Sequence, residues 1–201
     1  TLPEDAPNRF LINIQPDEAA AVGSFLDERL GDATLVPMVR ARVVEIAGTP
    51  VGEMAFPTER GRRLVDRESN LSWTDTLQSD NEVVAGDWWG EGAAPGLVSL
   101  EAEFAVDAGI ELGDELAFDV AGERFTARVA NFRSVQWDSF NTNFFMVFSP
   151  GSLDPYPHTF IASVHVDKTD LGLTLDLVRE YPSVTVIDID AALEQVRSVM
   201  N

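Results

Sequence analysis

The chain contains no cysteine, which excludes a disulfide framework, a zinc-thiolate site and a thiol nucleophile. This absence does not indicate a cellular compartment, because periplasmic and cytosolic domains of this size both fold without disulfides. The sequence also lacks an apolar run of about 18 residues or more, and no charged and then apolar signal peptide begins it. We therefore expect a soluble piece. Its start at Thr1 without a methionine predicts that it was cut from a longer protein.

Basic residues are scarce as well. The 201 residues hold 14 Lys and Arg against 34 Asp and Glu, a formal net charge of -20. Such a surface repels phosphate backbones and anionic headgroups, so nucleic acid is not an expected partner. Hydrophobic residues still make up 45% of the chain, which is unlike the composition of disordered segments. The composition predicts a folded, acidic chain of one domain or two small ones.

Motifs for hydrolysis are missing. The serine context Gly96 to Leu100 lacks the second glycine of a nucleophile elbow. Only two histidines occur, His158 and His165, and no H-E-x-x-H pairing exists, so we read both as structural. A Walker A motif and a calcium-binding loop are also absent. From these patterns we nominate no catalytic, cofactor-binding or metal-binding residue, and we expect no cofactor.

Acidic pairs at i, i+2 spacing are weak evidence of a catalytic site in a chain this rich in carboxylates. On a strand, both members of such a pair lie on one face, whereas on a helix they separate. Glycosidase chemistry stays open at this point, because its two carboxylates can come from distant parts of a sequence. The pairs are Glu101/Glu103, Asp66/Glu68 and Asp188/Asp190.

The two ends of the chain each predict a β-α-β unit. Residues 9–15 alternate as a strand, 17–30 carry a helical apolar stripe, and 35–46 form an apolar, β-branched run. Near the other end, 160–166 alternate and 184–189 form an apolar run. The strands that flank each helix are expected to be parallel neighbours, with the two units sharing one sheet. The helical stripes consist of Val22, Phe25, Leu26 and Leu30 in the first unit and Leu171, Leu175 and Val178 in the second. A last helix is expected from Leu193, Val196 and Met200.

Between these units the pattern changes to short strands. Residues 116–120 and 125–129 alternate around an Ala-Gly-Glu turn, which predicts a β-hairpin. We expect Trp88 and Trp89 to point to opposite sides of an extended segment, with core packing favoured, and Ser139 to Phe148 to enter a buried strand. The fold class predicted is α+β. The two β-α-β units form an α/β part of residues 1–65 plus 136–201, and a small β-rich subdomain of residues 66–135 is inserted between them.

Several motifs together resemble a known family. They are Leu71 to Leu77, Asp80 to Trp89 with its V-x-x-G-x-W-W stretch from Val83, Val98 to Ala105, and Gly109 to Phe125. Their order resembles the periplasmic, MacB-like core domain of FtsX/MacB-type ABC transporter permeases, and the nearest subfamily is the YbbP-like one. The resemblance implies a porter-like α/β part that carries a smaller, sabre-like β part.

The resemblance also implies a function. A domain of this kind is non-catalytic and lies at the periplasmic face of the bacterial inner membrane. It couples ATP hydrolysis by a separate cytoplasmic ABC ATPase to work on a lipid or other hydrophobic cargo. A periplasmic thioesterase/lysophospholipase is a further implied partner. Two other hypotheses stay open from sequence: a stand-alone periplasmic binding or adaptor module, and a hydrolase whose carboxylates converge in space, with Glu101 as the residue to test.

Overall fold

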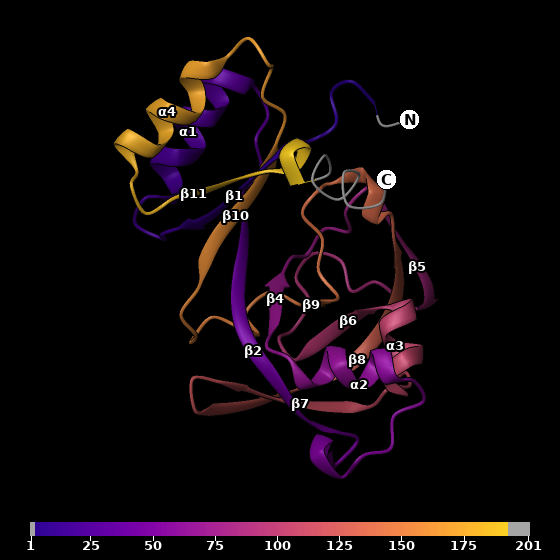
Figure 1. Cartoon of the computed structure of the whole chain (residues 1–201). Helices are drawn as coiled ribbons and strands as arrows, with labels where there is room; N and C mark the ends of the chain where they lie inside the picture. The colour runs from indigo at the N-terminus through magenta and orange to yellow at the C-terminus, as the bar shows by residue number, and fades with distance from the viewer. Residues whose placement is uncertain (1–2, 193–201) are drawn as a thin grey trace. The chain divides into compact units, whose positions relative to one another are not determined.

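A computed structural model describes residues 3–192 of the chain. These residues form two compact units (Figure 1). Unit one contains residues 3–37, 137–142 and 158–192, and unit two contains residues 38–136 and 143–157. The backbone therefore passes between the units four times. The predicted last helix lies outside the described residues apart from its first turn.

Unit one is a three-stranded sheet with helices packed against it. The central strand β1 pairs antiparallel with both of its neighbours, in the order β11-β1-β10. Arg9 at the start of β1 is opposite Asp188 at the end of β11, and their side chains form an ion pair of 3.1 Å. The elements are β1 (Arg9–Ile14), α1 (Ala19–Leu30), the 3-10 turn η2 (Trp137–Ser139), β10 (Thr159–Val164), α4 (Leu171–Glu180) and β11 (Thr185–Asp188).

This order corrects one expectation. The two strands that flank α4, β10 and β11, are parallel to each other but are not neighbours, because β1 lies between them and is antiparallel to both. The apolar stripe predicted for α1 does face the core. Val22 and Leu26 are fully buried, and Phe25 and Leu30 are partly buried against the same cluster. Burial of this stripe against the sheet is what holds α1 in place.

Unit two is built on a closed ring of strand pairings. The path β2-β4-β9-β6-β8 is closed by β7, which pairs with both β8 and β2, while β5 and β3 are attached outside the ring. Closing a sheet removes the free edges of all six ring strands. The elements are β2 (Val36–Ile46), β3 (Thr49–Pro50), the 3-10 turn η1 (Val51–Glu53), α2 (Glu59–Asp66), β4 (Ser69–Trp73), β5 (Asn81–Gly86), β6 (Leu97–Glu101), α3 (Ala102–Ala108), β7 (Glu115–Val120), β8 (Glu123–Val135) and β9 (Met146–Phe148).

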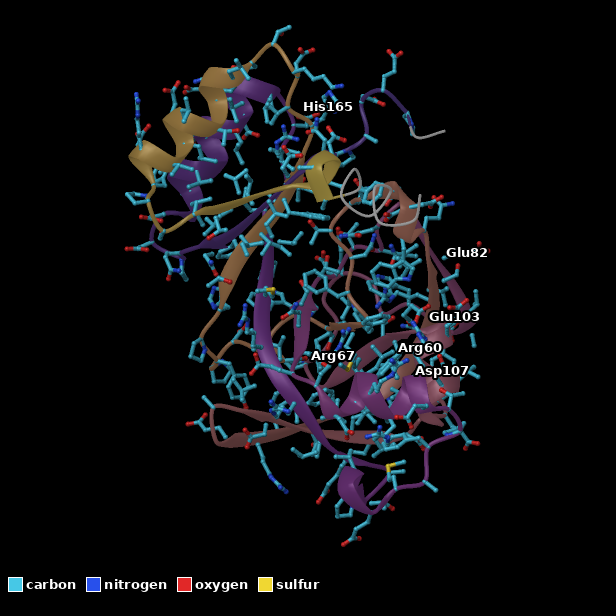
Figure 2. The ribbon with its side chains drawn as sticks, viewed as in Figure 1. Arg60, Arg67, Glu82, Glu103, Asp107 and His165 are labelled. Carbon is cyan, nitrogen blue, oxygen red and sulfur yellow. The ribbon has the colours of Figure 1, made fainter. Side chains whose placement is uncertain are left out.

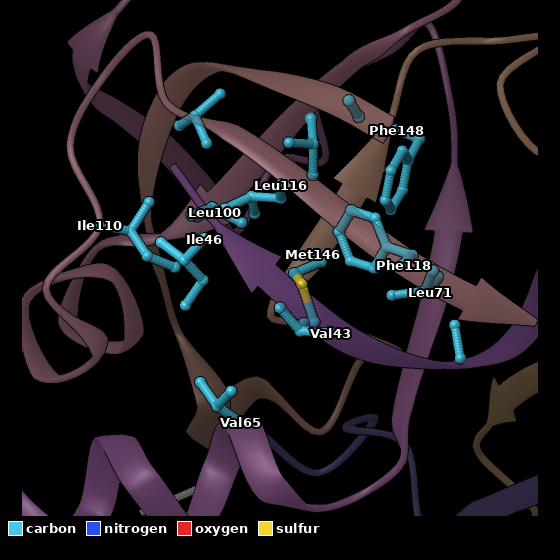
Figure 3. Close-up of a cluster of buried hydrophobic side chains, with 14 of the residues drawn as sticks. Val43, Ile46, Val65, Leu71, Leu100, Ile110, Leu116, Phe118, Met146 and Phe148 are labelled. Atoms are coloured by element: carbon cyan, nitrogen blue, oxygen red, sulfur yellow. The ribbon is translucent and has the colours of Figure 1, made fainter. Parts of the chain in front are cut away.

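The predicted hairpin forms β7 and the first half of β8. Phe118 is opposite Phe125, and the two rings stack with centroids 5.1 Å apart. The connection is a two-residue turn, with positive φ at Ala121 and Gly122, which is the turn geometry that matches the twist of paired strands. Phe118 also meets Phe148 edge to face inside the ring (Figure 3). Of the expected segment Ser139 to Phe148, only the last three residues form a strand, and all three are buried.

Unit two takes in more of the chain than the boundaries at residues 66 and 135 that the sequence suggested. Residues 38–65 belong to it because β2 pairs with β4 and β7, and because α2 packs against α3. The helix contact is very close: a Cβ atom on Gly61 would lie 1.9 Å from the carbonyl oxygen of Asp107. Beside it, Arg60 and Asp107 form an ion pair of 2.5 Å (Figure 2). Mixed α+β structure is confirmed, and an inserted β-rich part stays a prediction.

Candidate functional site

The most deeply buried charge in the described residues belongs to Arg133 on β8. Its side chain is 1% exposed and is surrounded by acceptors from three segments. Nε donates to the Ser99 hydroxyl at 2.7 Å, Nη1 donates to Asn81 Oδ1 at 2.6 Å, and Nη2 donates to the carbonyl of Phe144 at 2.9 Å. Longer contacts reach the carbonyls of Ser99 and Phe145. The guanidinium therefore links β5, β6 and the segment just before β9 to strand β8.

Burial lowers the pKa of Arg133 from its ordinary value to about 10, while the negative charges of Glu101 and Asp80 oppose the change. The group is still a cation at neutral pH. A buried charge is tolerated only when its hydrogen-bonding capacity is satisfied, as it is here. Because every described donor points at a fixed protein acceptor, we read this network as an organiser of unit two rather than as a reactive centre.

The acidic pairs of the sequence serve as caps and ion-pair partners. Glu101 is 3% exposed and accepts the backbone N–H of Phe104 at 2.7 Å, which caps the start of α3. Glu103, the other member of this pair, lies on α3 and is exposed (Figure 2). Asp188 and Asp190 both lie near Arg9, at 3.1 and 3.8 Å.

The third pair is also held by arginines. Asp66 binds Arg62 at 2.8 Å, and Glu68 lies 3.8 Å from Arg40. None of these three pairs places two carboxylates around a shared catalytic position.

The histidines have ordinary neighbours. Nδ1 of His165 lies 2.8 Å from the carbonyl oxygen of Ala6, and His158 meets the ring of Phe160 edge to face. Within residues 3–192, no group of three or more His, Asp or Glu side chains is arranged to hold a metal ion.

The two adjacent tryptophans correct the sequence prediction. Trp88 and Trp89 do not point to opposite sides. Their rings stack on each other with centroids 4.2 Å apart, and both are half-buried. Both indole N–H groups donate to one loop, to the carbonyls of Asp75 at 2.9 Å and Thr74 at 3.0 Å. The pair follows β5 outside regular strand structure, so the alternation of an extended segment does not apply.

Three large apolar side chains on helix α4 are exposed, which reverses a prediction. The residues that face the core are Leu173 and Leu177, both 1% exposed or less. The predicted stripe of Leu171, Leu175 and Val178 lies on the outer side, with exposed fractions of 78%, 58% and 39%. Both sets have helical spacing, so periodicity alone could not tell which one faces inward. An exposed row of large apolar side chains is typical of an interaction surface.

A groove of about 380 Å³ opens between this stripe and the sheet. We call it the α4 groove. Its lining comes from the first turns of α4, the loop before α4, and the facing ends of β1 and β11, all within unit one. The residues that line it are Arg9, Val166, Asp167, Lys168, Asp170, Leu171, Thr174, Leu175, Val186 and Asp188. The α4 groove and the stripe beside it are the candidate functional site.

Comparison with known proteins places this geometry in context. No family model matches the chain. The chain is 34% identical over 197 residues to the uncharacterised ABC transporter permease YbbP of Escherichia coli (strain K12), a match that covers 97% of the chain but 23% of YbbP. A crystal structure of a domain from Porphyromonas gingivalis, described as part of a permease protein, overlays with a TM-score of 0.44 at 9% identity, covering 92% of this chain and 91% of that one.

Across residues 3–192, no helix has both the length and the apolar character needed to cross a membrane. The chain spans about a quarter of the length of YbbP, and the match runs through all the motifs that carried the resemblance. The relationship inferred from the sequence is therefore confirmed: this chain is similar, over nearly its whole length, to one part of a YbbP-type ABC transporter permease.

Proposed function

We propose that this chain is a non-catalytic, periplasmic domain of an ABC transporter permease, in which it couples ATP hydrolysis by a cytoplasmic ATPase subunit to work on a hydrophobic cargo. The observation that carries the proposal is the match to YbbP over 97% of the chain, at an identity of 34%. The chain takes up 23% of that permease, which leaves ample length in a protein of that kind for membrane-spanning segments.

The organisation of the chain supports a mechanical role. The backbone crosses between the two units four times, so a displacement of one unit is passed to the other through the main chain. Coupling of this kind needs stiff bodies and no reactive side chain. Unit two is stiffened by its closed ring of strands and by the Arg133 network. In the proposal, unit one is the porter-like part and unit two the sabre-like part.

The cargo and the partners belong to the proposal as well. The exposed stripe on α4 supports an apolar cargo or partner, because burial of such a surface is favourable by about 25 cal/mol per Å². We propose a lipid or a related acyl compound as the cargo. A periplasmic thioesterase/lysophospholipase is the proposed enzyme that would receive it.

The first test reads the gene on both sides of this chain. The proposal expects apolar spans of about 20 residues on both sides. A signal peptide upstream and a stop codon soon after Asn201 would instead favour a free periplasmic binding module.

The second test measures coupling. The full permease and its ATPase are reconstituted in lipid nanodiscs, and ATP turnover is compared with a variant in which a short flexible linker replaces this domain. We expect the variant to keep basal ATP hydrolysis and to lose release of hydrophobic compounds from the nanodisc. Unchanged release in the variant would contradict the proposed role.

A further inference from the structure

Residues 3–8, which lead into β1, are held on unit one through Asn8. We call these residues the entry segment. Asn8 is only 6% exposed, although its side chain is polar. Its Nδ2 donates to the carbonyl oxygen of Val166 at 2.9 Å, and its Oδ1 accepts the backbone N–H of Val166 at 2.8 Å. The carboxamide therefore satisfies both backbone groups of one buried residue.

An asparagine at this position replaces pairing that the main chain cannot provide. Pro7 has no backbone N–H with which to continue the pairing of β1 with β10. The ladder between these strands begins at Arg9, which is opposite Val164. Beyond that point, the side chain of Asn8 supplies the donor and the acceptor that a continued strand would offer to Val166.

The backbone of Asn8 contacts both β10 and the residue that follows β11. Its N–H donates to the carbonyl oxygen of Val164 at 2.9 Å, and its own carbonyl oxygen accepts the backbone N–H of Ile189 at 2.9 Å. Ile189 comes directly after the last residue of β11. A single buried residue therefore links the entry segment, the end of β10 and the chain that leaves β11.

The rest of the entry segment is attached more weakly. Within the described part of the chain, residues 3–7 have one hydrogen bond to the rest of unit one, from Nδ1 of His165 to the carbonyl oxygen of Ala6 at 2.8 Å (Figure 2). A carbonyl only accepts, so the hydrogen lies on Nδ1. The neutral ring with this hydrogen and the imidazolium both donate there, so the contact does not depend on the charge of His165. Most of the hydrogen bonds that hold the entry segment come from Asn8.

We propose that Asn8 is a positioning residue for coupling, because it makes the entry segment move as one body with the sheet of unit one. This inference rests on the proposed function, in which membrane spans flank this chain and ATP hydrolysis displaces them. A displacement that arrives along the main chain reaches the sheet only if the entry segment stays bonded to it. Once freed, residues 3–8 can span up to about 20 Å, and straightening of this slack would absorb the displacement.

Hydrogen exchange on this chain measures whether Asn8 holds the entry segment. Asn8→Leu keeps the size of the side chain and removes its donor and its acceptor. We expect the amide of Val166 to exchange at least about tenfold faster in this variant, because it loses its acceptor, while the buried amide of Ala162 in β10 keeps its rate. Asn70→Leu, at an exposed asparagine of unit two, is the matched control and should change neither rate.

Coupling is measured with the full permease and its ATPase in nanodiscs, as the amount of hydrophobic compound released per ATP hydrolysed. We expect Asn8→Leu to lower this ratio by about fivefold or more and to leave basal ATP hydrolysis unchanged. His165→Leu loses one hydrogen bond, so it should lower the ratio less. Val22→Ala removes core packing from α1 but none of these hydrogen bonds, so it should destabilise unit one and keep the ratio.

Three results would overturn the inference: an unchanged exchange rate at Val166 in Asn8→Leu, an unchanged ratio in that variant, or an equal loss of the ratio in Val22→Ala. The last result would mean that lower stability alone explains the effect. If Asn8→Leu unfolds unit one, seen as fast exchange at Ala162 as well, His165→Leu takes its place, and an unchanged ratio there would overturn the inference. Failure of the proposed function is distinct, because the unmodified permease would then release no compound during ATP hydrolysis.

Discussion

Replacing Arg133 by methionine tests whether its buried network holds unit two together. The substitution keeps a long apolar stem but removes every donor. Three short hydrogen bonds are lost, to Ser99, Asn81 and Phe144. Each buried acceptor left without a donor costs about 2 kcal/mol, about 6 kcal/mol in all.

Part of this loss is offset, because methionine brings no charge into the interior. The lowering of the pKa of Arg133 to about 10 corresponds to a net cost of about 3 kcal/mol for holding this charge in the interior. We therefore expect Arg133→Met to lower the free energy of unfolding of unit two by about 3 kcal/mol. Arg133→Lys keeps the charge but loses the planar fork, so its effect should be smaller, about 1 to 2 kcal/mol.

The assay is equilibrium unfolding in urea, followed by tryptophan fluorescence in a Trp137→Phe background. That background leaves three tryptophans, all of them in unit two. Arg128→Met is the matched control, because Arg128 lies on the same strand and is exposed; its effect should stay within about 0.5 kcal/mol. Hydrogen exchange should also speed up at residues 144–146 in Arg133→Met. An unfolding free energy within about 1 kcal/mol of the control would refute the reasoning.

Three smaller effects can be measured on the same protein. Gly61→Ala should destabilise the α2–α3 contact by about 1 to 3 kcal/mol, since its Cβ would overlap the carbonyl of Asp107. Gly23 lies in an open position on α1, so Gly23→Ala should stabilise the protein by about 0.5 to 1 kcal/mol. Urea unfolding of the two variants compares these effects. Equal changes in the free energy of unfolding would contradict the argument from crowding at Gly61. Thr169→Val should raise the pKa of Asp167 toward its ordinary value, because it removes one of two hydrogen bonds that favour the carboxylate. An NMR titration measures this pKa. Because the pKa of Asp167 is lower in the folded state, its carboxylate stabilises the fold at any pH above its pKa in the unfolded chain. This stabilisation is lost as the pH falls through the pKa of the folded state. The variant should therefore lose less stability in acid.

Much of the architecture follows from local patterns. The hairpin around Ala121 and Gly122 was predictable because turn chemistry and alternation agree there. The direction in which a helix faces was not predictable for α4. Leu171, Leu175 and Val178 have the same helical spacing as a core stripe, while the buried Leu173 and Leu177 make a shorter row. Only the sheet beneath the helix decides between them.

Features that depend on distant pairings were not accessible from the sequence. The insertion of β1 between β10 and β11 joins residues about 150 to 180 apart, and the ring of unit two closes through β2 and β7. Arg133 gave no sequence signal, because its partners come from β5, β6 and the segment before β9. The α4 groove was likewise hidden, although the single lysine at its end could have drawn attention to it.

The pairing of the first and last described strands has a consequence for how the molecule yields to tension. Because Arg9 is opposite Asp188 in antiparallel register, the chain enters β1 and leaves β11 at the same end of the sheet. Pulling these two points apart loads the hydrogen bonds between the strands one after another, as in opening a zipper, instead of shearing them all at once. The Arg9–Asp188 ion pair is among the first interactions that such a pull would break, so the separation of β1 from β11 should begin at that pair.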